Sequence, residues 1–215
     1  MDITWYGQSC FRVKGKKATV IIDPFDPKAT GLMLPKMSAD ILLVTHQHPD
    51  HNNIAGVKES PFVIQAPGEY EVNGVDVVGV ATYHDDEKGA KRGKNVVYNL
   101  TLDGISLVHL GDLGHLIDEE TKERIGRVDV LMVPVGGTYT IDAGEAVKVI
   151  DMLEPRLIIP MHYKLAHLAY DLAPVDDFTR LAGKASVKVP DKFTIQLDTF
   201  PEDQTVLLME VEGRG

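Results

Sequence analysis

The stretch Ile41-Leu42-Leu43-Val44-Thr45-His46-Gln47-His48-Pro49-Asp50-His51 joins a continuous apolar run to three histidines and an aspartate. The apolar run is typical of a buried β-strand that ends where the polar cluster begins. Imidazole and carboxylate groups are ligands that suit zinc and related first-row metals. An ordinary solvated turn does not explain so many of them within six residues. The stretch therefore predicts a strand that holds a metal site at its carboxyl end.

The spacing within the cluster indicates more than one metal ion. In an extended segment, residues two apart point the same way, so His46 and His48 can share one ion. Asp50 and His51 are neighbours and must diverge, which suits a second ion close by. These short side chains do not fill two coordination spheres, and about two or three further ligands are needed, including a bridging carboxylate.

Further ligand candidates lie at the ends of other apolar runs. His84 follows Val80-Ala81-Thr82-Tyr83, Asp112 lies in Gly111-Asp112-Leu113-Gly114, and His162 follows Leu157-Ile158-Ile159-Pro160-Met161. A surface histidine, a turn aspartate and a core histidine are the respective alternatives. From the residues alone, these alternatives stay open for Asp112 and His162. The runs before His46 and His162 share one form, which is a weak sign of two similar halves.

The whole chain predicts one α/β domain. It has 215 residues with 44% hydrophobic and 25% charged content, which fits a single domain over residues 1–215. Short β-rich runs fill the first third, and strands alternate with helical patterns in the second half. A hairpin is expected to turn at Asp103-Gly104, and helices are expected to begin after Asp118 and Asp142.

Charge and composition restrict the function classes. The net charge of −10 argues against nucleic-acid binding by bulk phosphate neutralisation. The single cysteine, Cys10, excludes an internal disulfide and a cysteine zinc cluster. A secretory signal pattern and an apolar run of membrane-spanning length are both missing from the sequence. We therefore expect a cytoplasmic protein without a membrane partner.

The order of the ligand candidates resembles the metallo-β-lactamase superfamily over nearly the whole chain. The family motif H-x-H-x-D-H matches His46, His48, Asp50 and His51, and the later ligands match His84, Asp112 and His162. Within the superfamily, the chain is similar to a branch of metal-dependent hydrolases that includes the ascorbate-6-phosphate lactonases. That likeness lies in Tyr6-Gly7-Gln8-Ser9, Ile22-Asp23-Pro24-Phe25, His109-Leu110-Gly111-Asp112, Pro134-Val135-Gly136-Gly137 and Ile159-Pro160-Met161-His162-Tyr163.

The resemblance implies a metallo-β-lactamase fold, a four-layer αβ/βα sandwich with the metals at one edge. It implies a binuclear hydrolase that uses two divalent ions, zinc first, with manganese or iron as alternatives. The first ion is assigned to His46, His48 and His84. The second is assigned to Asp50, His51 and His162, and Asp112 is expected to bridge the two. Asp50 is also the expected catalytic residue that orients a hydroxide and carries its proton.

The expected partner is a small-molecule substrate, namely an anionic ester, lactone or phosphodiester. Asp23 is a candidate for accepting a proton from a ligand imidazole. Tyr139 and Lys164 are candidate substrate contacts, and the basic residues that follow His84 suit an anion as well as a solvated loop. Many relatives have histidine where this chain has Gln8, which alters that position's role. Assembly into a homo-oligomer stays open.

Three other functions remain as alternatives. One is a nuclease or phosphodiesterase acting on nucleic acid or nucleotides, which the net charge makes less favoured. Another is an iron-loaded redox enzyme on the same scaffold. The third is a non-catalytic metal-binding protein. Metal identity separates the hydrolase from the redox enzyme, and turnover separates an enzyme from a metal-binding protein.

Overall fold

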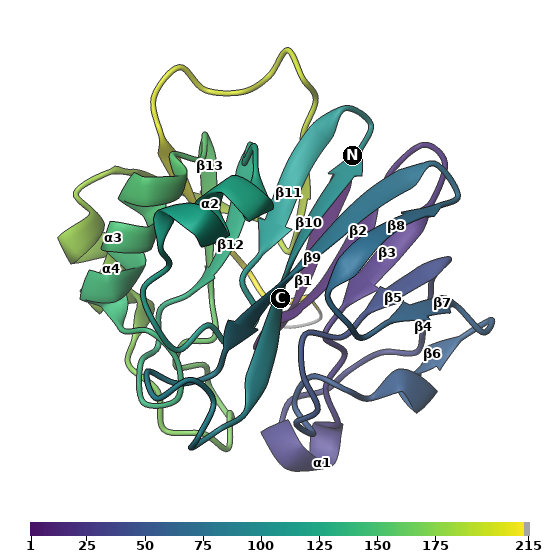
Figure 1. The fold of residues 1–215 in the computed structure, drawn as a ribbon, viewed down its shortest axis with the longest axis horizontal. Helices are drawn as coiled ribbons and strands as arrows, with labels where there is room; N and C mark the ends of the chain where they lie inside the picture. The colour runs from purple at the N-terminus through teal and green to yellow at the C-terminus, as the bar shows by residue number, and fades with distance from the viewer. Residues whose placement is uncertain (213–215) are drawn as a thin grey trace.

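The computed structural model describes residues 1–212 and contains two mixed β-sheets that pack face to face (Figure 1). Strands β15, β1, β2 and β3 of the six-stranded sheet are antiparallel, and β3, β5 and β7 are parallel. In spatial order this sheet consists of β15 (Lys192–Thr194), β1 (Asp2–Gly7), β2 (Cys10–Lys14), β3 (Thr19–Ile22), β5 (Ile41–Leu43) and β7 (Phe62–Ile64).

In the eight-stranded sheet, β8, β9, β10 and β11 pair antiparallel with one another. The remaining pairs, which join β11, β12, β13, β16 and β14 in that spatial order, are parallel. Its spatial order is β14 (Ala185–Val189), β16 (Thr205–Met209), β13 (Leu157–Met161), β12 (Val130–Pro134), β11 (Ile105–His109), β10 (Lys94–Leu102), β9 (Val75–Tyr83) and β8 (Gly68–Val72). A short parallel pair, β4 (Met37–Ser38) and β6 (Val57–Lys58), lies apart from both sheets.

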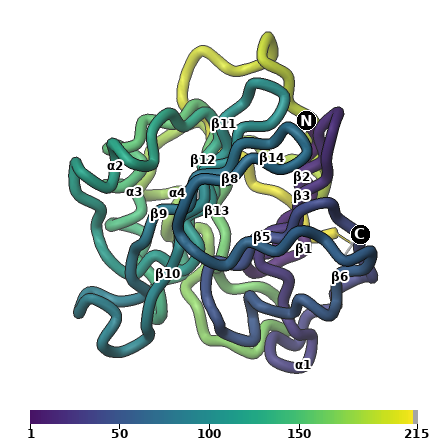
Figure 2. Tube along the Cα trace, turned by 45° about the vertical axis from the view of Figure 1, so that its right-hand side comes forward, coloured from purple at the N-terminus to yellow at the C-terminus, as the bar shows by residue number. Residues whose placement is uncertain are grey.

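Helices cover the outer faces unequally. The eight-stranded sheet carries α2 (Glu119–Ile125), α3 (Ala143–Leu153) and α4 (Val175–Ala182), and Figure 2 shows α2 and α3 on the side away from β1 to β3. In the described part of the chain, the helices on the side of the six-stranded sheet are the short α1 (Pro27–Thr30) and the 3₁₀ helix η1 (Ile54–Gly56). Among residues 1–212, no helix has the length and apolar character needed to cross a membrane.

Alternating side chains explain why the sheets stack. In β3, Val20 and Ile22 face the core between the two sheets, whereas Ile21 belongs to a second apolar cluster on the outer side. Every residue of β12 is buried, because this strand has the other sheet on one face and helices on the other. The hydrophobic effect thus fixes which face of each strand points inward.

The structure confirms the expected fold class and several predicted elements. The β10–β11 hairpin turns at Asp103-Gly104, where both residues have positive φ, 54° and 80°. Asp118 caps α2, and Asp142 caps α3 in a capping box with Glu145. The predicted domain extends to residue 215, so its last three residues lie outside the described range.

Candidate metal centre

The predicted ligands follow strands that end at one edge of the sandwich. His46 comes after β5 of the six-stranded sheet, and the other contributions come from the eight-stranded sheet: His84 after β9, Asp112 after β11 and His162 after β13. Strands β9, β11 and β13 run in the same direction, because β10 is antiparallel to both β9 and β11 while β11, β12 and β13 are parallel. Their carboxyl ends therefore meet at the same edge.

The structure brings all seven predicted residues together in two groups. One group is His46, His48 and His84, and the other is Asp50, His51, Asp112 and His162; in each, the potential ligand atoms lie within 4.8 Å of one another. Every member is buried except His48, which is partly exposed. The six other residues fall into the same two sets as in the sequence-based assignment, and Asp112 belongs to the second group.

The carboxylate of Asp112 lies at the centre of the cluster. Its Oδ2 is 3.2 Å from Nε2 of His51 and 3.3 Å from Nε2 of both His84 and His162. Nε2 of His46 is 3.8 Å from the same oxygen. Asp112 therefore reaches residues of both groups, which is the position that a bridging carboxylate requires.

Asp23 fixes the proton positions on two of the imidazoles. Its Oδ2 is 2.8 Å from Nδ1 of His51, and it accepts a 2.7 Å hydrogen bond from the Thr45 hydroxyl. A carboxylate only accepts, so Nδ1 of His51 carries the proton. The Thr45 hydroxyl donates its single proton to Asp23, and it must then accept from Nδ1 of His46, 2.9 Å away. The predicted hydrogen bond from a histidine to Asp23 is confirmed.

These tautomers leave two nitrogen lone pairs facing the interior of the site. Among residues 1–212, Nε2 of His46, Nε2 of His51 and Oδ1 of Asp112 are buried without a hydrogen-bond partner. Buried polar atoms normally have partners, and an orphaned set of ligand-type atoms is explained by an ion. The donor set of imidazoles and carboxylates suits zinc. The residues therefore fit a pair of divalent cations.

Electrostatics point the same way. Burial opposes ionisation of Asp112, but the imidazoles of His162 and His51 hold the pKa of this carboxyl well below its usual range. Burial and the neighbouring His51 lower the pKa of His46 to about 2, so that imidazole is neutral. If these imidazoles bind a metal through a lone pair they are neutral, and a cation then has to supply the positive charge that the buried carboxylate needs.

Gln8 orients Asp50, a contact that the sequence did not predict. The Gln8 amide donates a 3.0 Å hydrogen bond to Oδ2 of Asp50, and both side chains are buried. Burial opposes ionisation of Asp50, but His51 lowers the pKa of this carboxyl below its usual value. At position 8 this chain thus has a neutral donor that holds a carboxylate in place.

Three non-glycine residues of the site adopt left-handed backbone conformations. Gln8, Asp23 and His162 have φ of 49°, 47° and 51°, each at or just beyond the end of a strand. Such conformations cost about 1–3 kcal/mol per residue and persist only where the surrounding structure enforces them. At these three positions the surrounding structure therefore holds a strained backbone that places the side chain at the site.

Gly111 allows the turn that carries Asp112 to pass close to Thr45, the residue before His46. Its φ is +57°, and an added Cβ would lie 2.3 Å from Oδ1 of Asn95 and 2.8 Å from Cβ of Thr45. The same Asn95 oxygen accepts a 3.1 Å hydrogen bond from the Asp112 backbone N–H. Only glycine combines this conformation with this proximity.

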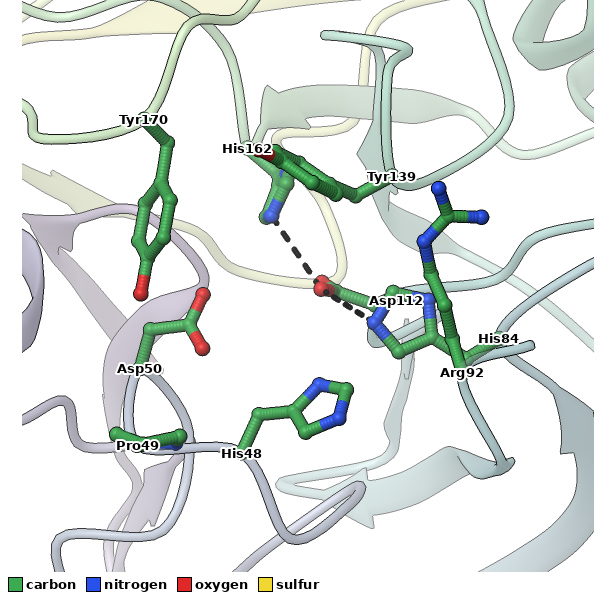
Figure 3. Close-up of a pocket in the computed structure, with 9 residues that line it drawn as sticks. All are labelled: His48, Pro49, Asp50, His84, Arg92, Asp112, Tyr139, His162 and Tyr170. Atoms are coloured by element: carbon green, nitrogen blue, oxygen red, sulfur yellow. Dashed lines mark ion pairs between the residues drawn. The ribbon is translucent and has the colours of Figure 1, made fainter.

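A cavity of about 290 Å³ opens onto the two groups (Figure 3). It is lined by His48, Pro49, Asp50, His84, Arg92, Asp112, Tyr139, His162 and Tyr170. Tyr139 was a predicted substrate contact and does line the cavity. Lys164, the other predicted contact, is exposed, lies 3.9 Å from Asp171 and does not line it. The sequence offered no signal for Tyr170 and singled out no member of the basic loop containing Arg92.

The remaining histidines are accounted for by other contacts. His109 is fully buried, accepts a hydrogen bond from the Gly111 N–H and therefore donates through Nε2 to the Ser9 carbonyl. Nε2 of His115 accepts from the Tyr83 N–H, and His167 lies in an exposed loop. None of these three belongs to either ligand group.

Comparisons with known proteins identify relatives described as metal-dependent hydrolases. The family described as "Beta-lactamase superfamily domain" matches residues 2–162. A UPF0173 metal-dependent hydrolase of Thermoplasma volcanium is 33% identical over 76% of this chain and 83% of its own length. One from Pyrococcus abyssi is 32% identical over 88% of this chain and 96% of its own length.

A solved structure is similar over almost the whole chain. It is a candidate Zn-dependent hydrolase of the metallo-β-lactamase superfamily from Thermotoga maritima, 42% identical, with a TM-score of 0.82. The similarity covers 98% of this chain and 99% of that one. The matched region includes every strand that carries a predicted ligand.

Proposed function

The chain belongs to the metallo-β-lactamase superfamily and, within it, to the UPF0173 metal-dependent hydrolases, and from that premise we propose that it is a binuclear hydrolase of small anionic esters, lactones or phosphodiesters. The observation that carries this proposal is the pair of adjoining ligand groups around Asp112. The Zn-dependent description of the Thermotoga maritima relative makes zinc the first candidate metal.

In this proposal, His46, His48 and His84 hold one ion, and Asp50, His51 and His162 hold the other. Asp112 joins both, since its Oδ2 reaches histidines of each group. Asp23 and Thr45 keep Nδ1 of His46 and His51 protonated, so Nε2 of each ring offers its lone pair to an ion. When bound, two such ions supply Lewis acidity and lower the pKa of a water molecule.

The protein's own groups then orient the substrate and move the proton. Asp50 lines the cavity and is held by Gln8, so it is the carboxylate best placed to accept the proton of an attacking water. Figure 3 shows the Tyr170 hydroxyl directed toward Asp50, on the same side of the cavity.

Esters, lactones and phosphodiesters share the features that this arrangement addresses. Each has an electrophilic centre with an oxygen to polarise and an oxygen leaving group to stabilise. The resemblance to the ascorbate-6-phosphate lactonases makes a phosphorylated lactone one member of this proposed class. A cavity of about 290 Å³ and a net charge of −10 favour a small molecule over nucleic acid.

The experiment that tests the proposal combines metal analysis with turnover. Elemental mass spectrometry of the freshly purified protein is expected to find about two zinc ions per chain. His48→Ala is expected to lower the metal content. Asp50→Asn is expected to lower kcat for bis(p-nitrophenyl) phosphate or a p-nitrophenyl ester by about a hundredfold or more. His115→Ala is the matched control, since this histidine lies outside both groups.

Each alternative function has its own outcome. Two irons per chain would favour the redox enzyme, and two zinc ions without turnover of any activated ester, lactone or phosphodiester would favour a metal-binding protein. Preferred cleavage of single-stranded or double-stranded nucleic acid would favour the nuclease. Full activity and metal content in Asp50→Asn would contradict the role of Asp50.

A further inference from the structure

Asp85 folds the basic loop that follows His84 around its own carboxylate. Oδ1 accepts hydrogen bonds from the backbone N–H groups of Glu87 and Gly89, at 2.9 and 2.8 Å. Oδ2 accepts from those of Lys91 and Arg92, at 3.0 and 2.7 Å. Asp85 is only 2% exposed. Four donors on one buried carboxylate give this surface loop a defined shape.

The shape of the loop directs Arg92 alone toward the metal centre. Arg92 is half-buried and is the one permanently cationic side chain among the residues that line the cavity. Lys91 pairs instead with Glu87 at 2.7 Å, and Lys88 is exposed. Lys94 lines a neighbouring hollow of about 430 Å³, which Arg92 and His48 also line.

The Arg92 guanidinium has donors to spare. Its Nη2 donates a 3.2 Å hydrogen bond to the Thr138 carbonyl, and its Cζ lies 5.6 Å from the centre of the Tyr139 ring. A guanidinium has five N–H donors, so these contacts orient it without saturating it. Within residues 1–212, no carboxylate lies within 4.0 Å of it, although the protein has a net charge of −10.

Tyr139 and Tyr170 line the cavity next to Arg92, and we call these three side chains the wall of the cavity. The rings of Tyr139 and Tyr170 meet edge to face, with 6.0 Å between their centres. Figure 3 shows Arg92 beside Tyr139 on the side of His84, and Tyr170 on the side of Asp50. The wall therefore presents a cation at one end and flat aromatic surface along its length, and all of it faces the metal centre.

We propose that Arg92 binds an oxyanion, a carboxylate or a phosphate, at the non-reacting end of the substrate, with Asp85 as the residue that positions it. The inference rests on the proposed hydrolase function and assigns the recognition of the anionic group to one side chain. The oxyanion replaces solvent on the free N–H donors, while the rest of the substrate lies along the tyrosines. Planar, two-pronged donation is the property that distinguishes arginine from lysine in such a site.

A purely structural role for Arg92 makes a different forecast. If the side chain only holds the loop against Thr138, its loss would weaken the binding of neutral and anionic ligands by the same factor. If it recognises an oxyanion, its loss would remove the preference for the anionic ligand. The test therefore measures the ratio between two ligands that differ only in charge.

Binding is measured on the zinc-loaded protein with glutarate monoanilide and the corresponding neutral primary amide, by isothermal titration calorimetry. The anilides mimic a small acyl substrate and resist hydrolysis, so the readout does not depend on turnover. We expect the carboxylate to bind at least about tenfold more tightly than the primary amide. In Arg92→Gln the ratio should fall toward one, and in Arg92→Lys it should be intermediate. The anilide of 4-phosphonobutyrate, in the same assay, distinguishes phosphate from carboxylate as the preferred oxyanion.

Asp85→Asn tests the positioning role. An amide can accept at only one of the two positions that each accept two N–H bonds, so the loop loses part of its framework. We expect the charge ratio to fall as it does in Arg92→Gln, with two zinc ions still bound. Lys91→Gln is the control, because this exposed lysine shares the loop but does not line the cavity.

The outcomes separate this inference from the proposed function. A charge ratio that is unchanged in Arg92→Gln, or one that is near unity in the unmodified protein, overturns the inference even if esters are hydrolysed. A ratio that depends on Arg92 in a protein without turnover supports the inference and contradicts the hydrolase. The same comparison with mono-p-nitrophenyl glutarate and its methyl ester extends the test to kcat/KM.

Discussion

Asp23 links two proposed ligands that belong to different ions, although it is not itself a proposed ligand. It holds Nδ1 of His51 directly and Nδ1 of His46 through the Thr45 hydroxyl. Both contacts fix which nitrogen carries the proton, and thereby which nitrogen faces the ions. The left-handed φ of 47° at Asp23 suggests that backbone strain is accepted in order to place this carboxylate.

Asp23→Asn is expected to weaken zinc binding about 10–100-fold. The amide nitrogen cannot accept a hydrogen bond, so the contacts to Thr45 and His51 cannot all be kept. A chromophoric chelator in competition with the protein measures the dissociation constant. Asp26→Asn is the control, since Asp26 caps α1 nearby and asparagine caps equally well. A zinc affinity within twofold of that of the unmodified protein would contradict the proposed role of Asp23.

Gln8→Met is expected to lower kcat about tenfold, with little change in KM. The substitution keeps the length of the side chain but removes the donor to Asp50, and one such hydrogen bond to a charged group contributes about 1.5–3 kcal/mol. Steady-state kinetics on the zinc-loaded protein provide the measurement. Gln204→Met, far from the site, is the control. A variant that instead loses zinc would mean that Gln8 assembles the metal centre rather than orienting Asp50.

Among the elements, the turns after the strands shape the site more than the strands do. Strands β5, β9, β11 and β13 deliver their ligands to one edge, but the turn between β11 and α2 must also pass close to Thr45 and Asn95. The Asn95 amide ties this turn down by donating to the Leu110 carbonyl and by accepting from the Asp112 N–H.

Gly111→Ala is expected to destabilise the metal-free protein by about 3 kcal/mol, through left-handed strain together with overlap on Asn95 and Thr45. Gly183→Ala is the control, with a similar φ of 58° but nothing within 4 Å of its added Cβ, and it should cost only about 1 kcal/mol. Urea unfolding measures both free energies. Equal losses for the two variants would show that the close approach at Gly111 does not matter.

For the whole molecule, the metal centre joins the two sheets. The ligand candidates in the loop after β5 follow a strand of the six-stranded sheet, and those after β9, β11 and β13 follow strands of the eight-stranded sheet. Ions bound across this seam would bind the folded chain and not the unfolded one. Metal binding should therefore contribute directly to the free energy of unfolding.

Removing the metals with a chelator is expected to lower the Tm by about 10 °C. Free zinc at a thousand times its Kd stabilises by about 4 kcal/mol, and each kcal/mol corresponds to about 2–4 °C in a chain of this size. The difference should shrink from pH 7.5 to pH 5, because protons compete for the imidazoles. Differential scanning calorimetry measures both effects. A Tm that does not depend on zinc at pH 7.5 would argue against ions at the seam.

Much of the site could be predicted because its ligands follow local patterns. An apolar run that ends in histidine or aspartate indicates a strand and a ligand at its end, and the structure brings His46, His84, Asp112 and His162 together at such ends. The pairing of Asp23 with an imidazole followed from the same reasoning. A single domain, a cytoplasmic location and the state of assembly stay predictions.

Other features depend on contacts that no local pattern encodes. Gln8 meets Asp50 across 42 positions of sequence, and Arg92 meets Thr138 across 46. Tyr170 lies in a loop without regular structure and reaches the cavity only because that loop packs beside Tyr139. Asp85 looked like one acidic residue of a solvated run, and only the folded loop reveals its four backbone donors.

The sequence by itself therefore determined the ligand chemistry and the order of strands that carry it. Both depend on side-chain type and on alternation over a few residues, which act locally. The tertiary structure alone decided which cation faces the metals, which aromatic rings border the cavity and which donor holds Asp50. These depend on loop conformations fixed by hydrogen bonds between distant parts of the chain, whose free energy exists only once the two sheets have packed.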